Sequence, residues 1–558
     1  MINFCNRNKT HLLNSLSVLV LLLVAVLYYS ACSQGQLENL FNSDSLQIAS
    51  MYKDLFVDNN SINGWGLSTS ASFFPDMFFY FLLNFIFGSF IKATIYYGFL
   101  QIIILTFLLN RIYRLVNPSL PESLTTISIL LLSLFFLCNI LFGYNLYAFL
   151  LISNNYHVGT FNCALLSYWL LLLYFKNNKS IYLILLFVVL FLAQISDRLF
   201  LVLFYLPVVS IIVIVWITKP KTIKIVRIGL LFLLFISAIA ISEYGHYKIA
   251  TSGIVEFPKS TLTNFGFLTE KVGNTVTLEF IWSLIKDYID IISAFSVRSI
   301  LISMIGVSFI LSVVVAIKNV KRIRKTNEEI TAFYYYNCFS VLFFIIVILA
   351  PLSHWHHTTE NDWTRFYFSA YILALFNLPI WIAFLFKNKL QKIIFFNKFI
   401  LFVLVMSFVL TVITLIKNES FTKFRALLNY YPENVKEIDK MAEQNKLHYG
   451  VADYWDAKVI NMFTRKNLHV YAVHFSMCPY EVLANNNWFY QSIENKNEAP
   501  VFNFIVMNRF ERRDYIEDSF CDSIVKIKSR TTEIWKVPDF YYIRTEWKPQ
   551  LIDKQKNK

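Results

Sequence analysis

The sequence predicts an α-helical polytopic membrane protein with about 11 membrane-spanning helices and a C-terminal α/β domain outside the cytoplasm. Two observations predict this class. First, 56% of the 558 residues are hydrophobic, 18% are aromatic and only 15% are charged, which is far from the composition of soluble domains. Second, apolar stretches of roughly 20 residues recur up to about residue 416 and then cease. The chain therefore divides into a membrane domain, residues 1–416, and a polar domain, residues 417–558.

Each candidate span is an apolar stretch long enough to carry a helix across the hydrocarbon core. The span centres lie near residues 21, 103, 134, 166, 188, 208, 233, 303, 341, 376 and 404. The fifth and sixth spans are close together around the sequence QISDRLF, residues 194–200.

Basic residues beside the span ends predict the orientation, because cytoplasmic loops are enriched in Lys and Arg. With the N-terminus inside, every basic cluster falls on the cytoplasmic side. These clusters are residues 110–114, 176–179, 219–224, 318–325 and 387–392. The net charge of +14 is then mainly a topology signal and gives no support for nucleic-acid binding. We expect a multi-pass protein of the plasma (inner) membrane.

An odd number of spans sends the polar tail to the outer face. The outer loop 32–91 contains an apolar piece, residues 73–88, that is short and bounded by Pro and Gly, so we interpret it as a helix in the membrane interface. A crossing there would invert the basic pattern of every later loop. Residues 11–31 are interpreted as a retained span; a cleaved signal sequence, even a lipoprotein site at Cys32, is the alternative.

The polar tail has the alternating pattern of a small α/β domain. A helix is predicted over 432–447, buried strands over 468–475 and 501–508, and a hairpin over 523–537. Cys478 and Cys521 lie in this tail, and a disulfide between them and two unpaired thiols are both open.

Asp44 heads the sequence NSDSLQIASMYKDLF, residues 42–56. With Asn42 or Ser43 as N-cap, the spacing predicts a short amphipathic helix with Asp44 in its first turn. Its apolar face comprises Ile48, Tyr52, Leu55 and Phe56. A purely structural explanation is available, since an acid in the first turn stabilises the helix dipole.

The order of these parts resembles the GT-C superfamily of polytopic glycosyltransferases. A first span is followed by an outer acid, an amphipathic helix and the sequence PDMFFYFLLNFIFG, which runs into a span ending in Arg111 and Arg114. His157 in SNNYHVGTFN at the start of a span extends the resemblance. Two tail segments, YGVADYWDAKVI (449–460) and FNFIVMNRF (502–510), are similar to segments of such bacterial proteins.

The resemblance implies a transferase that takes a sugar from a polyprenyl-phosphate carrier at the outer membrane face, with Asp44 as general base. A carboxylate can remove the proton of an acceptor hydroxyl as its oxygen attacks the anomeric carbon, which gives inversion. The acceptor is a glycan, a lipid or a protein. Departure of the phosphate needs cationic or hydrogen-bonding groups, or a divalent ion.

Five residues are candidates for substrate binding: His157, Asp197, Arg198, His354 and Arg365. Ionisable groups at membrane depth tend to mark sites, although Asp197 and Arg198 could simply pair with each other. His157 could equally be a polar residue capping a span.

His354 and Arg365 lie in HWHHTTENDWTRF (354–366), where a solvated loop is the alternative. A metal at Glu360 and Asp362 is not favoured, because the later outer loops show no clear Asp-x-Asp, so we expect no metal cofactor. The outer segment 254–280 could be a lid.

Two other classes stay open. A transporter or flippase would place charges within spans and often shows paired broken helices, and neither feature is found in the sequence. A non-catalytic envelope-assembly protein with the same fold is the other alternative. The aromatic segments YWDAK (454–458) and NNNWFY (485–490) could stack on sugars, but filling the core is the better interpretation.

Overall fold

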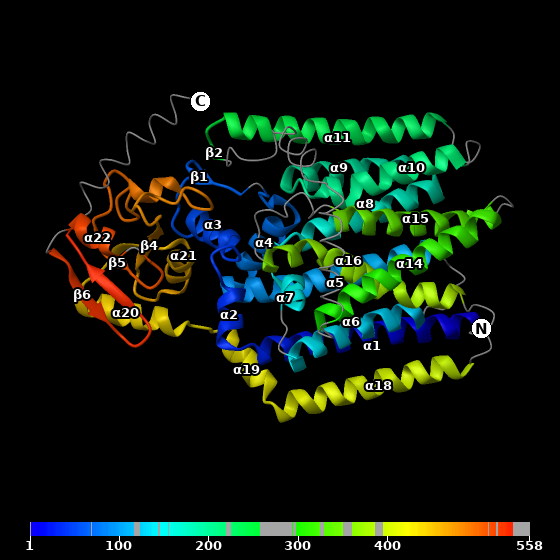
Figure 1. Cartoon of the computed structure of the whole chain (residues 1–558), viewed down its shortest axis with the longest axis horizontal. Helices are drawn as coiled ribbons and strands as arrows, with labels where there is room; N and C mark the ends of the chain where they lie inside the picture. Colours follow the sequence, from blue (N-terminus) through cyan, green and yellow to red (C-terminus); the bar gives the residue numbers. More distant parts are fainter. Residues whose placement is uncertain are drawn as a thin grey trace.

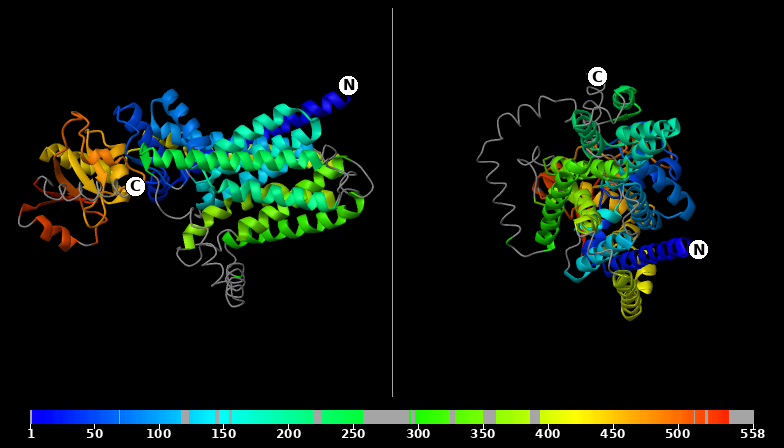
Figure 2. Two further views of the ribbon diagram at one scale, coloured as in Figure 1. Left: turned by 90° about the horizontal axis from the view of Figure 1, so that it is seen from above. Right: turned by 90° about the vertical axis from the view of Figure 1, so that its right-hand side faces the viewer.

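In the computed structural model, long helices lie side by side in a bundle, and a five-stranded sheet lies beyond one end of it (Figure 1, Figure 2). The structure describes residues 2–538 except 69, 117–122, 143–145, 154–155, 219–224, 257–292, 294–296, 324–327, 350–359, 386–393, 512 and 521–522. The N-terminus lies at the end of the bundle far from the sheet (Figure 1). This separation agrees with the predicted topology, in which the N-terminus and the polar tail lie on opposite sides of the membrane.

Each predicted span centre falls within one helix of the bundle, because long apolar runs satisfy their backbone hydrogen bonds internally. These helices are α1 (Ile2–Ala31), α5 (Phe90–Val116), α6 (Ser123–Phe142), α8 (Val158–Asn177), α9 (Ser180–Ser196), α10 (Leu206–Thr218), α11 (Ile225–Thr251), α14 (Val297–Ile323), α15 (Glu328–Leu349), α16 (Glu360–Leu385) and α18 (Ile394–Lys417).

Among the described residues, five helices are long and apolar enough to cross a membrane, or six if α18 and the bent α19 (Ser420–Leu427) form one span. The others are shorter apolar helices. The chain is therefore a multi-pass helical protein, and the count of about 11 spans stays a prediction. On α11, Val226, Leu233 and Ile236 are exposed, as expected of a face that meets lipid.

Short elements cover the sheet end of the bundle. They are α2 (Gln34–Leu40), α3 (Gln47–Phe56), β1 (Trp65–Gly66), the π-helical turn η1 (Phe73–Met77), α4 (Phe78–Phe87), α7 (Leu146–Ile152), η2 (Leu201–Tyr205) and β2 (Val255–Glu256), which pairs in parallel with β1. Along α4, Phe78, Leu82, Phe85 and Ile86 form an exposed apolar stripe. This stripe fits the prediction of a helix at the membrane interface.

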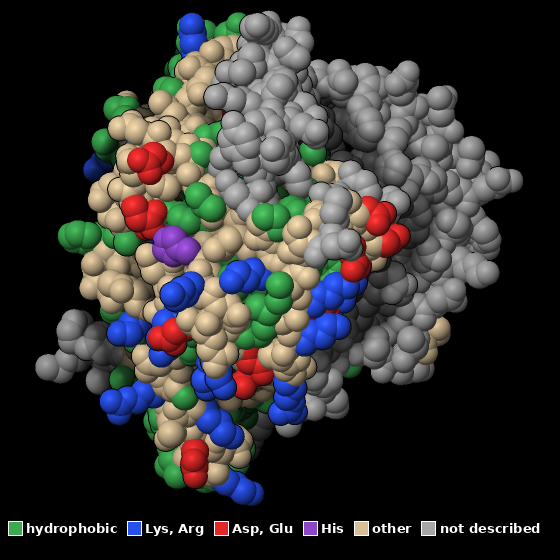
Figure 3. Space-filling view, turned by 90° about the vertical axis from the view of Figure 1, so that its left-hand side faces the viewer, with side chains coloured by type: hydrophobic (Ala, Val, Ile, Leu, Met, Phe, Trp, Pro, Cys, Tyr) green, Lys and Arg blue, Asp and Glu red, His purple; other side chains and the backbone are tan. Residues whose placement is uncertain are grey.

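The sheet has the order β4-β3-β5-β7-β6, with β4, β3 and β5 parallel and the β7–β6 hairpin antiparallel. Its strands are β3 (Tyr449–Ala452), β4 (His469–Ala472), β5 (Phe502–Val506), β6 (Val525–Lys528) and β7 (Glu533–Lys536), and its helices are α20 (Glu433–Asn445), α21 (Tyr454–Phe463), η4 (Asn486–Phe489) and α22 (Arg513–Phe520). The predicted helix, both predicted strands and the hairpin are thus confirmed. Charged side chains of both signs are scattered over the described part of this end of the molecule, among polar and hydrophobic ones (Figure 3), as expected of a surface in water.

Buried aromatic rings and one carboxylate join this α/β unit to the outer loop 32–91. Phe41 stacks on Tyr430 and meets Phe463 edge-on. Asp54, only 1% exposed, accepts hydrogen bonds from four side chains. The donors are Asn60, Trp65, Asn485 and Trp488, at 2.5–2.9 Å. The outer loop and the tail therefore pack as one body above the helical bundle.

Candidate functional site

Asp44 lies in a tight turn, residues 42–46, where the outer loop meets α21. Asn42 shapes the turn, since its Oδ1 accepts a hydrogen bond from the Ser45 amide at 2.8 Å. Its Nδ2 donates to the Tyr156 hydroxyl at 3.2 Å. The Ser43 hydroxyl donates to the Tyr454 carbonyl at 2.6 Å. The turn is thus held by its own Asn42 side chain and by two distant parts of the chain, at Tyr156 and Tyr454.

The predicted position of Asp44 in the first turn of a helix is wrong. Helix α3 begins at Gln47 with Leu46 as N-cap, so Asp44 precedes it. The Asn42 side chain closes a turn of its own at this point, and the Tyr454 hydroxyl donates to Asp44 Oδ1 at 2.5 Å. The predicted apolar face is recovered in part. Ile48 is buried and Tyr52 packs on Phe56, although Phe56 itself is exposed.

Two side chains of α21, Tyr454 and Lys458, lie near Asp44. Burial and the Asp44 carboxylate raise the pKa of Tyr454 well above its usual range, so Tyr454 is a stable hydrogen-bond donor. Lys458 is buried, and its Nζ donates to the Ser43 carbonyl at 3.3 Å. Burial lowers the pKa of Lys458 to about 7, while the Asp44 carboxylate opposes this decrease. The charge near Asp44 therefore changes close to neutral pH.

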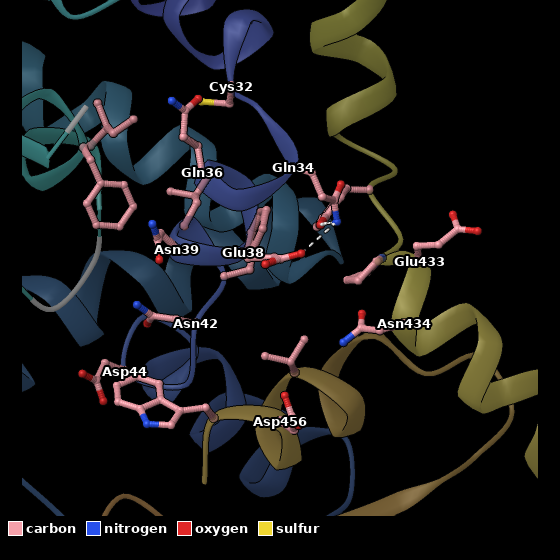
Figure 4. A pocket seen from close by; sticks show the side chains of 18 of the residues that line it. Cys32, Gln34, Gln36, Glu38, Asn39, Asn42, Asp44, Glu433, Asn434 and Asp456 are labelled. Atoms are coloured by element: carbon pink, nitrogen blue, oxygen red, sulfur yellow. Dashed lines mark hydrogen bonds between the residues drawn. The ribbon is translucent and has the colours of Figure 1, made fainter. Parts of the chain in front are cut away.

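Asp44 borders two cavities, of about 1060 Å³ and 660 Å³. Figure 4 shows the larger one, with Asp44, Asn42 and Asn39 along one side and Asp456 below. Trp455 and Arg509 also border both cavities, and Trp455 is 43% exposed. A carboxylate, an indole and a guanidinium thus line the same two cavities.

The lining of the larger cavity is rich in neutral hydrogen-bonding groups and aromatic rings. The amide side chains are Gln34, Gln36, Asn39, Asn42, Asn434 and Asn508, and the rings belong to Tyr28, Phe41, Phe149, Tyr156, Tyr430 and Trp455. Amides suit the hydroxyl groups of a sugar, and aromatic faces suit its C–H face. Such a lining can hold a carbohydrate. Four carboxylates, Glu38, Asp44, Glu433 and Asp456, also line this cavity.

Arg509 is the only Lys or Arg among the described residues that line these two cavities. It follows β5, and its Nε donates to Asp456 Oδ1 at 3.0 Å. Burial raises the pKa of Asp456, and the neighbouring Arg509 opposes that increase. The Arg509 side chain is 55% exposed, so the guanidinium can reach an anion in either cavity.

His157 and Asp197, two predicted site residues, contact each other. Asp197 accepts from Thr160 at 2.6 Å and lies 2.6 Å from His157 Nδ1. Asp76 lies close to this pair, since its carboxylate interacts electrostatically with both His157 and Asp197. The same carboxylate lies against Gly159, where a Cβ would meet it at 2.5 Å. Tyr97 donates to Asp76 at 2.5 Å. These buried groups are not among the residues that line the two cavities. They adjoin the site through Tyr156, which precedes His157 and contacts Asn42.

Arg198 does not pair with Asp197, contrary to the structural alternative raised by the sequence. Its Nη2 donates to Glu243 Oε2 at 2.8 Å, so each member of the pair has a partner on another helix. His354 lies outside the described residues. Arg365 belongs to α16, but its side chain also lies outside them. Cys521 also lies outside the described residues, and Cys478 is a free cysteine in the structure. The lid at 254–280 stays a prediction, because this segment is described only as far as Glu256.

Sequence reasoning missed Tyr454, Lys458 and Arg509 as site residues. They lie in the two tail segments that resemble those of GT-C proteins. The sequence alone does not show whether an aromatic or basic side chain in such a segment points into a cavity, into the core or into solvent. Trp455 was assigned to the core and lies open instead. Trp488 and Phe489 are buried, as predicted for the NNNWFY segment.

Comparison with known proteins gives a limited result. No protein-family model and no curated protein matches the chain. Solved structures of an oligosaccharyltransferase from Archaeoglobus fulgidus do match. Its apo form aligns over 88% of this chain and 69% of its own, with a TM-score of 0.45 and 11% identity.

Two further structures of that protein show the same level of similarity. One is tethered to an acceptor peptide containing the NVT sequon, with 94% and 74% coverage, a TM-score of 0.45 and 11% identity. The other is a complex with an inhibitory peptide and a dolichol-phosphate, with 93% and 74% coverage, a TM-score of 0.41 and 10% identity. A similarity of this size does not establish a shared activity.

Proposed function

We propose that the protein is a membrane glycosyltransferase, which transfers a sugar from a polyprenyl-phosphate-linked donor to an acceptor at the outer face of the membrane. The observation that carries this proposal is the position of Asp44. Its carboxylate borders a large cavity lined by amides and aromatic rings, between the helical bundle and the α/β unit. A lipid-linked sugar has both chemistries, an apolar tail that needs a bilayer and a head that needs hydrogen bonds.

In the proposed reaction, Asp44 accepts the proton of an acceptor hydroxyl. The hydroxyl oxygen then forms a bond to the anomeric carbon, and the bond from that carbon to the phosphate oxygen breaks with inversion. The hydrogen bond from Tyr454 orients the Asp44 carboxylate. The proposal includes no metal, in keeping with the expectation from the sequence.

The departing phosphate carries the electron pair of the broken bond and needs a cation. Arg509 and Arg198 are each paired with a carboxylate. Arg509 fits this role better because it borders both cavities beside Asp44, whereas Arg198 lines neither of them. Trp455 offers an exposed indole face on which a sugar ring could stack. His157 and Asp197 contact each other next to Tyr156, which in turn contacts Asn42 of the site. Arg365 stays a further candidate for binding phosphate.

The test is sugar transfer by the full chain in detergent or proteoliposomes, with radiolabelled hexoses on polyprenyl phosphate and release of the carrier measured. Asp44→Asn should lower transfer by a factor of about 100 or more, the usual contribution of a general base. Asp58→Asn is the control, since Asp58 pairs with Lys53 away from both cavities.

Equal transfer by wild type and Asp44→Asn would remove Asp44 from the base role. A wild-type protein that binds these donors but never releases the carrier would favour the non-catalytic alternative. Movement of the intact donor between leaflets would favour a flippase.

A further inference from the structure

A second cluster of ligand-type side chains lies in the α/β unit. His448, His469 and Glu494 each place one potential metal-binding atom within 4.8 Å of the others. His448 directly precedes β3, and His469 is the first residue of β4, where it pairs with Tyr449. Glu494 comes from the segment after η4. None of the three borders the cavities beside Asp44.

His469 is the most informative member of the cluster. It is only 3% exposed, and neither of its ring nitrogens has a hydrogen-bond partner. A buried polar group without a partner costs free energy, and so it is rare in folded proteins. A metal ion bound to one nitrogen would compensate for that loss.

The other two side chains of the cluster, His448 and Glu494, contact each other. His448 Nε2 lies 2.7 Å from Glu494 Oε1, and the Tyr449 hydroxyl donates to Glu494 Oε2 at 2.5 Å. A hydrogen bond to the second carboxylate oxygen is the usual way in which a metal-binding carboxylate is oriented. The side chains of His448 and Glu494 are 41% and 50% exposed, so an ion can reach them and they can adjust to it.

We propose that His448, His469 and Glu494 bind a divalent transition-metal ion, with zinc preferred. Two imidazoles and one carboxylate suit zinc far better than magnesium or calcium. Bonds of about 2.0–2.2 Å in a tetrahedron place ligand atoms roughly 3.4 Å apart. To reach that geometry, the His448–Glu494 pair at 2.7 Å has to widen and the separations of up to 4.8 Å have to shorten. Water would fill the fourth position.

Contacts of two lysines near the cluster, Lys53 and Lys496, indicate the structural effect that a bound ion would have. Lys53 is close enough to affect His469, but it is paired with Asp58 at 2.7 Å. Lys496, two residues after Glu494, binds Asp58 and Asn60 of the outer loop. The ion would therefore fasten the segment around Glu494 to the sheet, and through Lys496 it would help to hold the outer loop 32–91.

The test is a zinc titration of the full-length protein, purified without a histidine tag, stripped with a chelator and freed of it. A chromophoric competitor reports affinity, and thermal unfolding provides a second readout. Wild type should bind one tight equivalent that H448A and E494Q weaken by a factor of about 100 or more, with magnesium unable to compete. Y449F, which removes only the orienting hydroxyl, should weaken binding roughly 10-fold.

Glu498→Gln is the matched control, because Glu498 is exposed on the same segment but outside the cluster. Circular dichroism checks that each variant is folded. Equal zinc binding by wild type, H448A and E494Q would overturn the proposal and would place the ion elsewhere, for example at residues 354–357. Absence of tight zinc binding by wild type would also overturn it. Neither result depends on sugar transfer.

Discussion

Asp44 lies just before α3 and Asp54 lies in the last turn of that helix, ten residues later, and the two carboxylates have opposite environments. Asp54 is buried and accepts hydrogen bonds from two tryptophans and two asparagines. Asp44 is half-buried, accepts a hydrogen bond from Tyr454 and borders two cavities. A carboxylate saturated by buried donors stabilises a junction, whereas one that a substrate can reach is able to take a proton. The comparison separates a structural acid from a chemical one within a single segment.

The largest effect expected from this comparison concerns Asp54. Asp54→Ala leaves the indole N–H groups of Trp65 and Trp488 buried without an acceptor, at about 1–3 kcal/mol each. We expect a loss of about 4 kcal/mol of stability, visible as a lower midpoint of thermal unfolding by tryptophan fluorescence. Asp58→Ala, which breaks only the partly buried ion pair with Lys53, should cost less than Asp54→Ala. Equal midpoints for the two variants would refute the structural role of Asp54.

Arg509 sharpens the other side of the comparison. Arg509→Gln should lower transfer from lipid-linked donors by a factor of about 10–100, because a charged hydrogen bond to phosphate contributes roughly 1.5–3 kcal/mol. Arg198→Gln serves as the comparison and should have the smaller effect on transfer per folded molecule, since Arg198 lines neither cavity. A larger loss with Arg198→Gln would move the phosphate site into the bundle.

Lys458 gives a pH test of the charge around Asp44. Its folded pKa of about 7 lies below the unfolded value near 10.4, so the unfolded chain binds more protons between these values. Stability should therefore rise with pH from about 7 to 10, by up to about 1.4 kcal/mol per unit. Below pH 7, Lys458 is protonated in both states, so its contribution to stability should not change with pH. Lys458→Met should remove this slope when unfolding midpoints are compared from pH 6 to 9. An unchanged slope would show that Lys458 is not buried as described.

The smallest effect is expected at Trp455. Trp455→Ala should raise the KM for the sugar substrate several-fold, since an aromatic stacking contact contributes about 1 kcal/mol, while the unfolding midpoint changes little because the indole is 43% exposed. Trp455→Phe should retain most of the affinity. A large loss of stability in Trp455→Ala would restore the core assignment made from the sequence.

Local patterns predicted much of this fold. Every predicted span centre falls within a helix, because the length of an apolar run is visible in the sequence itself. Four of the five strands of the tail, β4 to β7, were predicted from their local patterns, whereas β3 was not. The order of the strands, with β3 between β4 and β5, depends on pairings between distant segments and was not predictable.

The site was predictable only as far as its position along the chain. Asp44 could be selected because it follows the first span. Its distance from a helix start could not be predicted, since the Tyr454 that contacts it is 410 residues away. Asp197 and Arg198 are adjacent in sequence, yet their partners are 40 and 45 residues away. Proximity in sequence was therefore a poor guide to which charges pair.

The most direct test of the account compares Asp44→Asn with Asp54→Asn in the same membranes, with sugar transfer per folded molecule and thermal unfolding both measured. The account predicts that Asp44→Asn loses transfer by about 100-fold or more with an unchanged unfolding midpoint. It predicts that Asp54→Asn unfolds at lower temperature but retains transfer while folded. The reverse pattern, or full transfer by Asp44→Asn, would contradict the assignment of Asp44 as the base.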